Sequence, residues 1–247
     1  MAIVYVGGQT AGRTNASSAV SVNFALTNGV DTVPRYLDLV VVAVVTGSAG
    51  GTPAMAITTP ANYTAATQIN VNATGDTSMN VSYKVMGVTP DTAVTIPGTG
   101  NNAYGEAYTI QVFRNVDTTT PMDATIVRQS GTGTGRPNPD PITPVTAGAW
   151  VVICGGGAIG GTGANYTAPA NFTTNFLTTF GADTTDGMIG SGYWGGWTSG
   201  AVDPAAYTGG TTGAGDSWAA FTLALRPMIH YPCDLVVAPQ MPINRPR

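Results

Sequence analysis

Residues 79–85 read Met79-Asn80-Val81-Ser82-Tyr83-Lys84-Val85, with apolar side chains at the odd positions and polar ones at the even positions. Neighbouring side chains of a β-strand point to opposite faces, so this alternation predicts a strand within 79–86 that has one buried and one solvated face. No stretch of the chain shows a sustained helical period. Seven further runs, rich in Val, Ile, Thr and aromatic residues and bounded by Gly, Pro, Asn or Asp, also predict strands: Ala19–Leu26, Leu37–Thr46, Gln68–Ala73, Ala107–Val116, Ala149–Cys154, Met188–Thr198 and Ser217–Leu225. The sequence therefore predicts an all-β fold.

Short motifs recur in the same order at an offset of about 110 residues. The clearest pair is Thr59-Pro60-Ala61-Asn62-Tyr63-Thr64 and Ala168-Pro169-Ala170-Asn171-Phe172-Thr173. The repetition predicts two halves, at about 37–128 and 148–240, joined by a linker or long loop at Gln129–Ala147. These halves correspond either to two tandem immunoglobulin-sized sandwiches or to one larger sandwich with pseudo-symmetric halves. The predicted strand at Ala19–Leu26 has no counterpart before the second half, which favours one interlocked domain.

The composition is poor in charge. Charged residues make up 9% of the 247, against roughly 25% in a typical globular chain. Nine Lys and Arg residues and a net charge of −4 argue against a nucleic-acid partner, which would need a basic patch. No apolar run approaches the roughly 20 residues of a membrane helix, and no signal peptide is visible. We therefore expect a protein made in the cytoplasm, without a membrane partner.

Several segments together resemble a protein family. They are Leu37–Val42, Pro60–Thr64, Tyr83-Lys84, Phe113–Asp117 with Pro121–Asp123, Trp150–Val152 and the closing Trp218–Pro227, WAAFTLALRP. Their order resembles the concanavalin-like jelly-roll domain of tailed-phage structural proteins and bacterial surface proteins, over about residues 17–227. The closing strand is the most specific part. The resemblance implies a jelly-roll-type β-sandwich with a virion or surface role and brings no catalytic residues with it.

The resemblance and the composition give one domain organisation. Residues 1–16 form an N-terminal strand or arm, 17–227 the β-sandwich with its two pseudo-repeated halves, and 228–247 an extended Pro-rich C-terminal arm. The arm is expected to dock on a neighbouring molecule, because apolar side chains in it are costly to leave in water. The arm residues chosen for this role are Leu235, Val236, Val237, Ile243, Arg245 and Arg247.

Motifs that suggest enzymes have simpler interpretations. The run Gly155–Gly160 fits G-x-G-x-x-G, but Gly161 to Pro169 leave no helix to hold a pyrophosphate, so we expect a flexible turn. Gly215-Asp216-Ser217 is expected to be a turn that opens a strand, because the only histidine, His230, lies in the Pro-rich tail. The carboxylates Glu106, Asp183 and Asp186 form no distinctive pair. No cofactor is expected.

Other features leave two interpretations open. Asp183 and Asp186 lie either in a calcium loop or in a solvated loop of Asx turns. Cys154 and Cys233 are either two thiols or one bridge. Aromatic residues beside glycines either stack on a sugar or belong to the core or a subunit interface, the second being favoured: Tyr193, Trp194, Trp197 and Tyr207.

These observations lead to one functional hypothesis. The protein is expected to be a non-enzymatic virion structural protein on the exterior of a tailed phage, either a capsid decoration or cement protein or a tail or fibre component. It is expected to form homo-oligomers, most naturally trimers, and to contact the major capsid or tail protein through edge strands and terminal arms. The alternative is a carbohydrate-binding adhesin that uses the exposed aromatics on a host glycan.

Overall fold

The computed structural model describes residues 1–48, 57–100, 104–158, 166–180, 187–209 and 215–229. These residues form strands and no helix, which confirms the all-β sandwich. None of them forms a helix that could cross a membrane. One five-stranded sheet has the order β1 (Val4–Arg13), β7 (Tyr104–Arg114), β3 (Leu39–Ser48), β5 (Asp76–Val85) and β4 (Thr64–Val71). The other has the order β11 (Thr173–Phe180), β12 (Gly187–Trp194), β9 (Trp150–Ala158), β14 (Ser217–Leu225) and β8 (Val127–Thr132).

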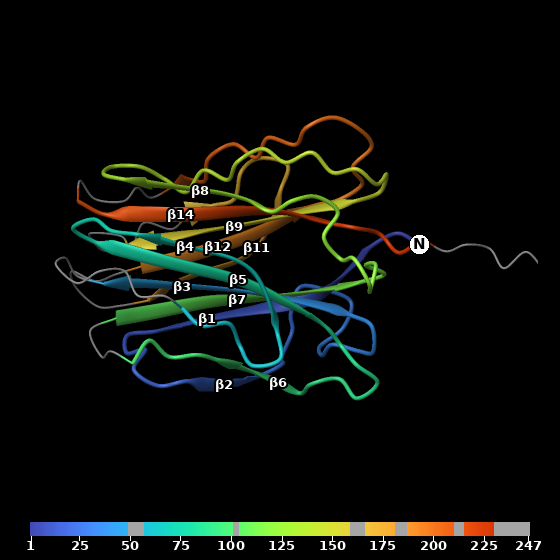
Figure 1. Ribbon diagram of the computed structural model, residues 1–247, viewed down its shortest axis with the longest axis horizontal. Helices are drawn as coiled ribbons and strands as arrows, with labels where there is room; N and C mark the ends of the chain where they lie inside the picture. Colours follow the sequence, from blue (N-terminus) through green and yellow to red (C-terminus); the bar gives the residue numbers. More distant parts are fainter. Residues whose placement is uncertain (49–56, 101–103, 159–165, 181–186, 210–214, 230–247) are drawn as a thin grey trace, which may run out of the picture.

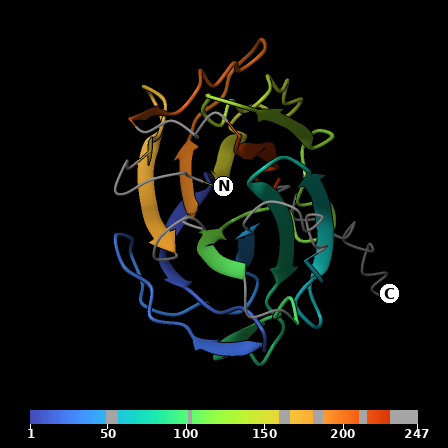
Figure 2. The ribbon, with the colours of Figure 1, turned by 90° about the vertical axis from the view of Figure 1, so that its left-hand side faces the viewer.

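The two sheets face each other, and all strand pairs within them are antiparallel (Figure 1). At their edges β1 lies beside β11 and β4 beside β8. Viewed end-on, the short pair β2 (Val20–Asn23) and β6 (Ala93–Ile96) lies outside the first sheet (Figure 2). A second short pair, β10 (Tyr166–Thr167) and β13 (Thr208–Gly209), belongs to the chain that covers the second sheet.

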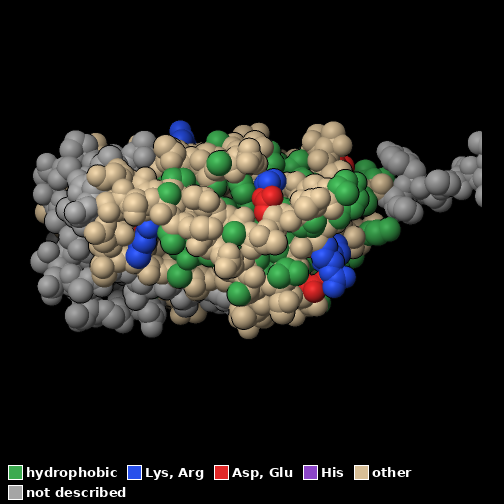
Figure 3. All heavy atoms as spheres, turned by 90° about the horizontal axis from the view of Figure 1, so that it is seen from below, with side chains coloured by type: hydrophobic (Ala, Val, Ile, Leu, Met, Phe, Trp, Pro, Cys, Tyr) green, Lys and Arg blue, Asp and Glu red, His purple; other side chains and the backbone are tan. Residues whose placement is uncertain are grey.

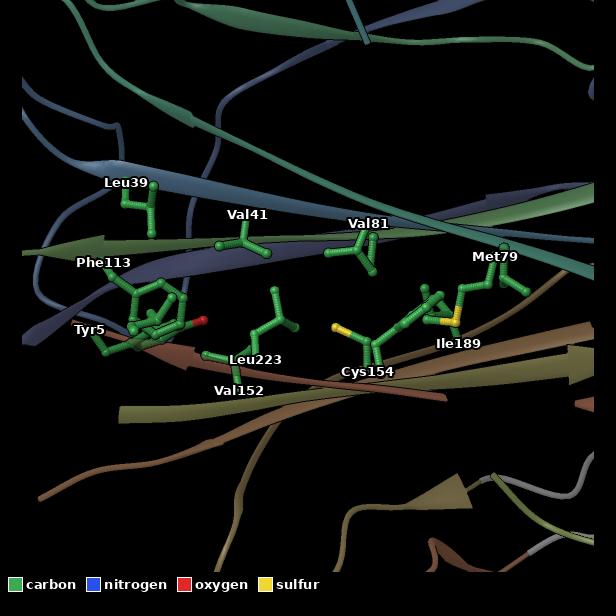
Figure 4. Close-up of a cluster of buried hydrophobic side chains, with 14 of the residues drawn as sticks. Tyr5, Leu39, Val41, Met79, Val81, Phe113, Val152, Cys154, Ile189 and Leu223 are labelled. Atoms are coloured by element: carbon green, nitrogen blue, oxygen red, sulfur yellow. The ribbon is translucent and has the colours of Figure 1, made fainter. Parts of the chain in front are cut away.

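The central strands of each main sheet are buried on both faces, whereas the edge strands β4 and β8 are partly exposed. The solvated face predicted for the strand within 79–86 is therefore wrong, because Asn80 and Ser82 of β5 are buried. In β3, Leu39 and Val41 point into the core between the sheets, whereas Val40 and Val42 pack under the outer cover with residues such as Ile96. A strand covered on both faces reads as a continuous apolar run. Figure 4 shows the central core, in which side chains from β3 and β5 meet side chains from β9 and β14.

The repeated motifs correspond to repeated topology. The strand order β1-β7-β3-β5-β4 of the first sheet matches β8-β14-β9-β12-β11 of the second, when strands are paired by their place in each half. The turn before β4 and the turn before β11 also match. Asn62 and Asn171 adopt φ of 65° and 75°, and in each turn the next residue donates a backbone hydrogen bond of 3.1 Å to the proline two residues before the asparagine. Each half thus supplies one sheet of a single sandwich.

Two segments differ from the expected loops. Gln129–Thr132, the start of the expected linker, belongs to the edge strand β8, whose alternating polar side chains resemble a loop in composition. The expected flexible turn at Gly155–Gly160 is also wrong for its first residues, because Gly155, Gly156 and Gly157 lie inside β9 between β12 and β14. Close packing explains these glycines: a Cβ on Gly155 would lie 2.6 Å from Pro137 Cβ.

Candidate functional site

The predicted aromatic cluster divides into core and surface residues. Tyr193 lies within the sandwich, stacked between Tyr5 at 4.6 Å and Trp150 at 5.0 Å between ring centroids. Burial raises the pKa of Tyr193. Tyr207 is fully buried, and its hydroxyl donates a 3.1 Å hydrogen bond to the carbonyl oxygen of Gly190. Both tyrosines therefore stabilise the fold: Tyr207 is closed to a ligand, and half-buried Tyr193 packs against the central core.

Trp194 and Trp197 instead line a surface depression of about 390 Å³. Trp194 is half-buried, whereas Trp197 is 7% exposed and its Nε1 donates a 2.8 Å hydrogen bond to Gly200 O. The rest of the wall comes from two other segments: Ala170, Asn171, Phe172, Ser199, Ala201, Val202 and Asp203. The fold thus brings a repeated turn, the end of β12 and a covering loop to one site.

A second depression, of about 330 Å³, lies at the equivalent place in the first half. Its repeated turn contributes Asn62 and Tyr63, the counterparts of Asn171 and Phe172. Strand register assigns Lys84 to the place of Trp194, because Thr64 pairs with Tyr83 as Thr173 pairs with Tyr193.

The side chains around this second depression satisfy one another. Lys84 Nζ lies 2.5 Å from Asp91 Oδ2 and 5.8 Å from the centroid of the Tyr63 ring. The same backbone framework therefore carries an ion pair with a cation–π contact in one half and two tryptophans in the other.

Exposed apolar side chains gather at the end of the sandwich where β1 begins and β14 ends, called here the terminal end. Strand register places the start of β3 and the end of β5 at this end as well. The large apolar side chains that are exposed within the described ranges all lie in its segments: Met1, Val30, Val33, Tyr36, Val88, Val145 and Ile229. Figure 3 shows one face of the molecule, on which charged side chains are few.

A groove of about 330 Å³ lies at the terminal end between the two chain ends. Met1, Trp150, Pro227 and Ile229 are among the residues that line it. The amino group of Met1 donates a 2.9 Å hydrogen bond to Met228 O, so the two chain ends are held together at this groove.

Several predicted residues lie outside the described part of the chain. They are the arm residues Leu235, Val236, Val237, Ile243, Arg245 and Arg247, the loop carboxylates Asp183 and Asp186, and Cys233 and His230. Cys154 is a free thiol within the core, and burial raises its pKa to about 12.

The remaining enzyme-like features have structural partners. Ser217 is fully buried and its hydroxyl donates a 2.7 Å hydrogen bond to Gly75 O. Glu106 is buried beside Arg13, with 2.7 Å between Oε1 and Nη2, and burial raises the pKa of Glu106 to about 7. Within the described ranges, no three His, Cys, Asp or Glu side chains lie close enough together to hold a metal ion.

Three of the residues at the first depression were not predicted from the sequence as site residues. Asn171 and Phe172 were recognised only as part of a repeated motif, and Asp203 had no signal of its own. A comparison of the two halves would have pointed to the site, because the residue after Tyr83 is Lys84 whereas the residue after the equivalent Tyr193 is Trp194. No protein-family model matches the chain, and no curated protein matches its sequence.

Proposed function

We propose that this protein is a non-enzymatic structural protein on the exterior of a tailed-phage particle, as a capsid decoration protein or a tail component. It docks on copies of itself and on the underlying capsid or tail protein through the terminal end. The observation that carries this proposal is the gathering of exposed large apolar side chains around both chain ends. Val88 is 82% exposed and Val30 is 64% exposed, and both lie in loops of this end.

Apolar side chains in such numbers at one end favour a protein interface over a free surface. Burying apolar surface contributes about 25 cal/mol of favourable free energy per Å², so a contact that covers these side chains stabilises an assembly. The chain itself covers the central strands of both sheets, and the large apolar side chains that are exposed in the described ranges lie at the terminal end.

The charged groups at the terminal end suit an interface. Arg114 forms a bidentate pair with the buried Asp38, with both N–O distances 2.8 Å, and it also contacts Asp31 at 3.3 Å. Arg226 pairs with the buried Asp123 at 3.1 Å. A partner that covers this end meets charges that are already paired, which limits the desolvation cost of docking.

Oligomeric state and particle content test the proposal. The purified chain is expected to form a trimer in light scattering, and mass spectrometry is expected to find it in particles. Val30→Asp and Val88→Asp place a charge in the interface and are expected to give monomers. Thr132→Asp, a control at an exposed position of β8 at the opposite end, is expected to leave the trimer intact. A monomeric wild-type protein that is absent from particles overturns the proposal.

A further inference from the structure

We propose that the depression bounded by Trp194, Phe172 and Asp203, which lies over the second sheet beside the terminal end, binds a neutral saccharide. The first step of the argument is the comparison between the two halves. The fold contains the same turn twice, and the turn at Asn62 has the same backbone conformation although Lys84, not a tryptophan, lies beside it. The turn and the strand beside it therefore form without a tryptophan at this position. In the second half, Trp194 and Phe172 pack against the buried cluster that contains Val151, and they also line the depression.

The chemistry of the wall suits a sugar ring. Trp194 and Phe172 are half-buried, so part of each ring faces the depression they line. The face of an aromatic ring carries negative charge density, and it attracts the polarised C–H groups on one side of a pyranose. Binding sites of this kind combine apolar walls with a small number of polar groups that fix the orientation of the ligand.

Asn171 and Asp203 supply those polar groups. Both side chains are exposed at the depression, and neither has a hydrogen-bond partner within the described ranges. A carboxylate accepts hydrogen bonds from sugar hydroxyls, and an amide both donates and accepts. Asp91 at the equivalent depression is already paired with Lys84, so that site offers no such carboxylate.

The absence of basic residues from the wall narrows the class of sugar. Among the described residues, those that line the depression include Asp203 but no Lys, Arg or His. An anionic sugar, such as a sialic or uronic acid, would meet a carboxylate without a compensating cation. The site therefore fits a neutral hexose or N-acetylhexosamine.

The wall is also held in place before any ligand arrives. The backbone of Trp197 is tied to the sandwich by a 3.1 Å hydrogen bond to Ala149 O and by a 2.7 Å hydrogen bond from Gly148 N. Val202 exchanges hydrogen bonds of 2.8 and 2.9 Å with Ile142. A preformed wall avoids the cost of ordering a loop on binding.

An array of neutral oligosaccharides ending in hexose or N-acetylhexosamine tests the proposal with the full chain. We expect at least one to bind, and isothermal titration with that sugar to show affinity about tenfold lower or worse for Trp194→Ala. Asp203→Ala changes an exposed side chain that has no hydrogen bond or ion pair within the described ranges, and it is also expected to weaken binding. The matched control is Lys84→Ala at the equivalent depression, for which unchanged affinity is expected.

Two results overturn the saccharide site. One is the failure of every sugar on the array to bind the wild-type chain. The other is that Trp194→Ala and Asp203→Ala, both with wild-type melting temperatures, bind the sugar as tightly as Lys84→Ala does. Light scattering on the same variants keeps the two proposals separate, because a variant that loses sugar binding is expected to keep its oligomeric state.

Discussion

Gly156→Ala tests whether the glycine run is a packed strand. A Cβ at Gly156 would lie 2.6 Å from the backbone oxygen of Met188 and 3.2 Å from Val45 Cγ2. Met188 belongs to the adjacent strand β12, so relieving the contact requires a shift of a central strand. Overpacking of this kind costs about 1–3 kcal/mol, and the lower entropy of an unfolded chain with Ala returns about 0.4–1 kcal/mol. We expect a net destabilisation of about 1–2 kcal/mol, which lowers the Tm of a chain this long by about 2–8 °C.

Gly87→Ala is the matched control, measured in the same calorimetric and urea-unfolding series. A Cβ at Gly87 meets no atom within 4 Å, and its backbone is outside the left-handed region. Its Tm is expected to stay the same or rise slightly, because Ala only restricts the unfolded chain there. If Gly156→Ala is as stable as Gly87→Ala, then residues 155–157 tolerate side chains as a loose turn does, and the packing argument is wrong.

Three further predictions concern buried titratable groups. Burial alone would raise the pKa of Asp123, but its hydrogen bonds with Thr146, Val145 and Arg226 lower it. The ionised Asp123 therefore stabilises the fold above the ordinary carboxyl pKa, and this contribution is lost as pH falls through the lowered pKa of the folded state. The difference in Tm between wild type and Asp123→Asn should narrow in acid. A difference that stays constant with pH contradicts this prediction. Burial raises the pKa of Glu106 from 4.5 to about 7, so the folded state keeps a proton that the unfolded state has released. The free energy of unfolding should therefore fall as pH rises from about 4.5 to about 7. Glu106→Gln should remove this pH dependence. If the variant keeps the same pH dependence, other groups cause it. Cys154 is 1% exposed and should resist iodoacetamide until urea unfolds the chain, as peptide mapping would show; rapid labelling of the native protein refutes its burial.

The central strands were predictable, but two of the four edge strands of the main sheets were not. Each of the eight predicted runs overlaps an observed strand, and Ser217–Leu225 matches β14 at both ends. The central strands among them carry apolar runs because they are covered on both faces. The edge strands β8 and β11 were not predicted, and β1 was predicted only as an N-terminal strand or arm at 1–16. All three are rich in Gly, Thr and polar residues, so their composition resembles that of loops.

The candidate site was predictable in part. Tyr193 and Trp194 are neighbours on β12, and the period of a strand requires them to face opposite sides. That rule alone places one ring in the core and the other outside, although it does not say which. The contributions of Phe172 and Asp203 depend on how a turn and a covering loop meet beside β12, which follows from tertiary packing rather than from local pattern.

The scarcity of charge in the strands has an architectural cause. In a two-layer sandwich every second strand residue faces water and is usually polar, but here the outer faces of both sheets are covered. Three of the four buried acidic residues in the described ranges are paired with arginines: Asp38 with Arg114, Glu106 with Arg13, and Asp123 with Arg226. Covering by the chain therefore accounts for the few charges in the strands, and most charged residues within the described ranges, such as Asp31, Asp91 and Asp203, lie outside them. The proposed docking through the terminal end agrees with this arrangement, because the ions there are already paired, as Arg114 is with Asp38 and Arg226 with Asp123.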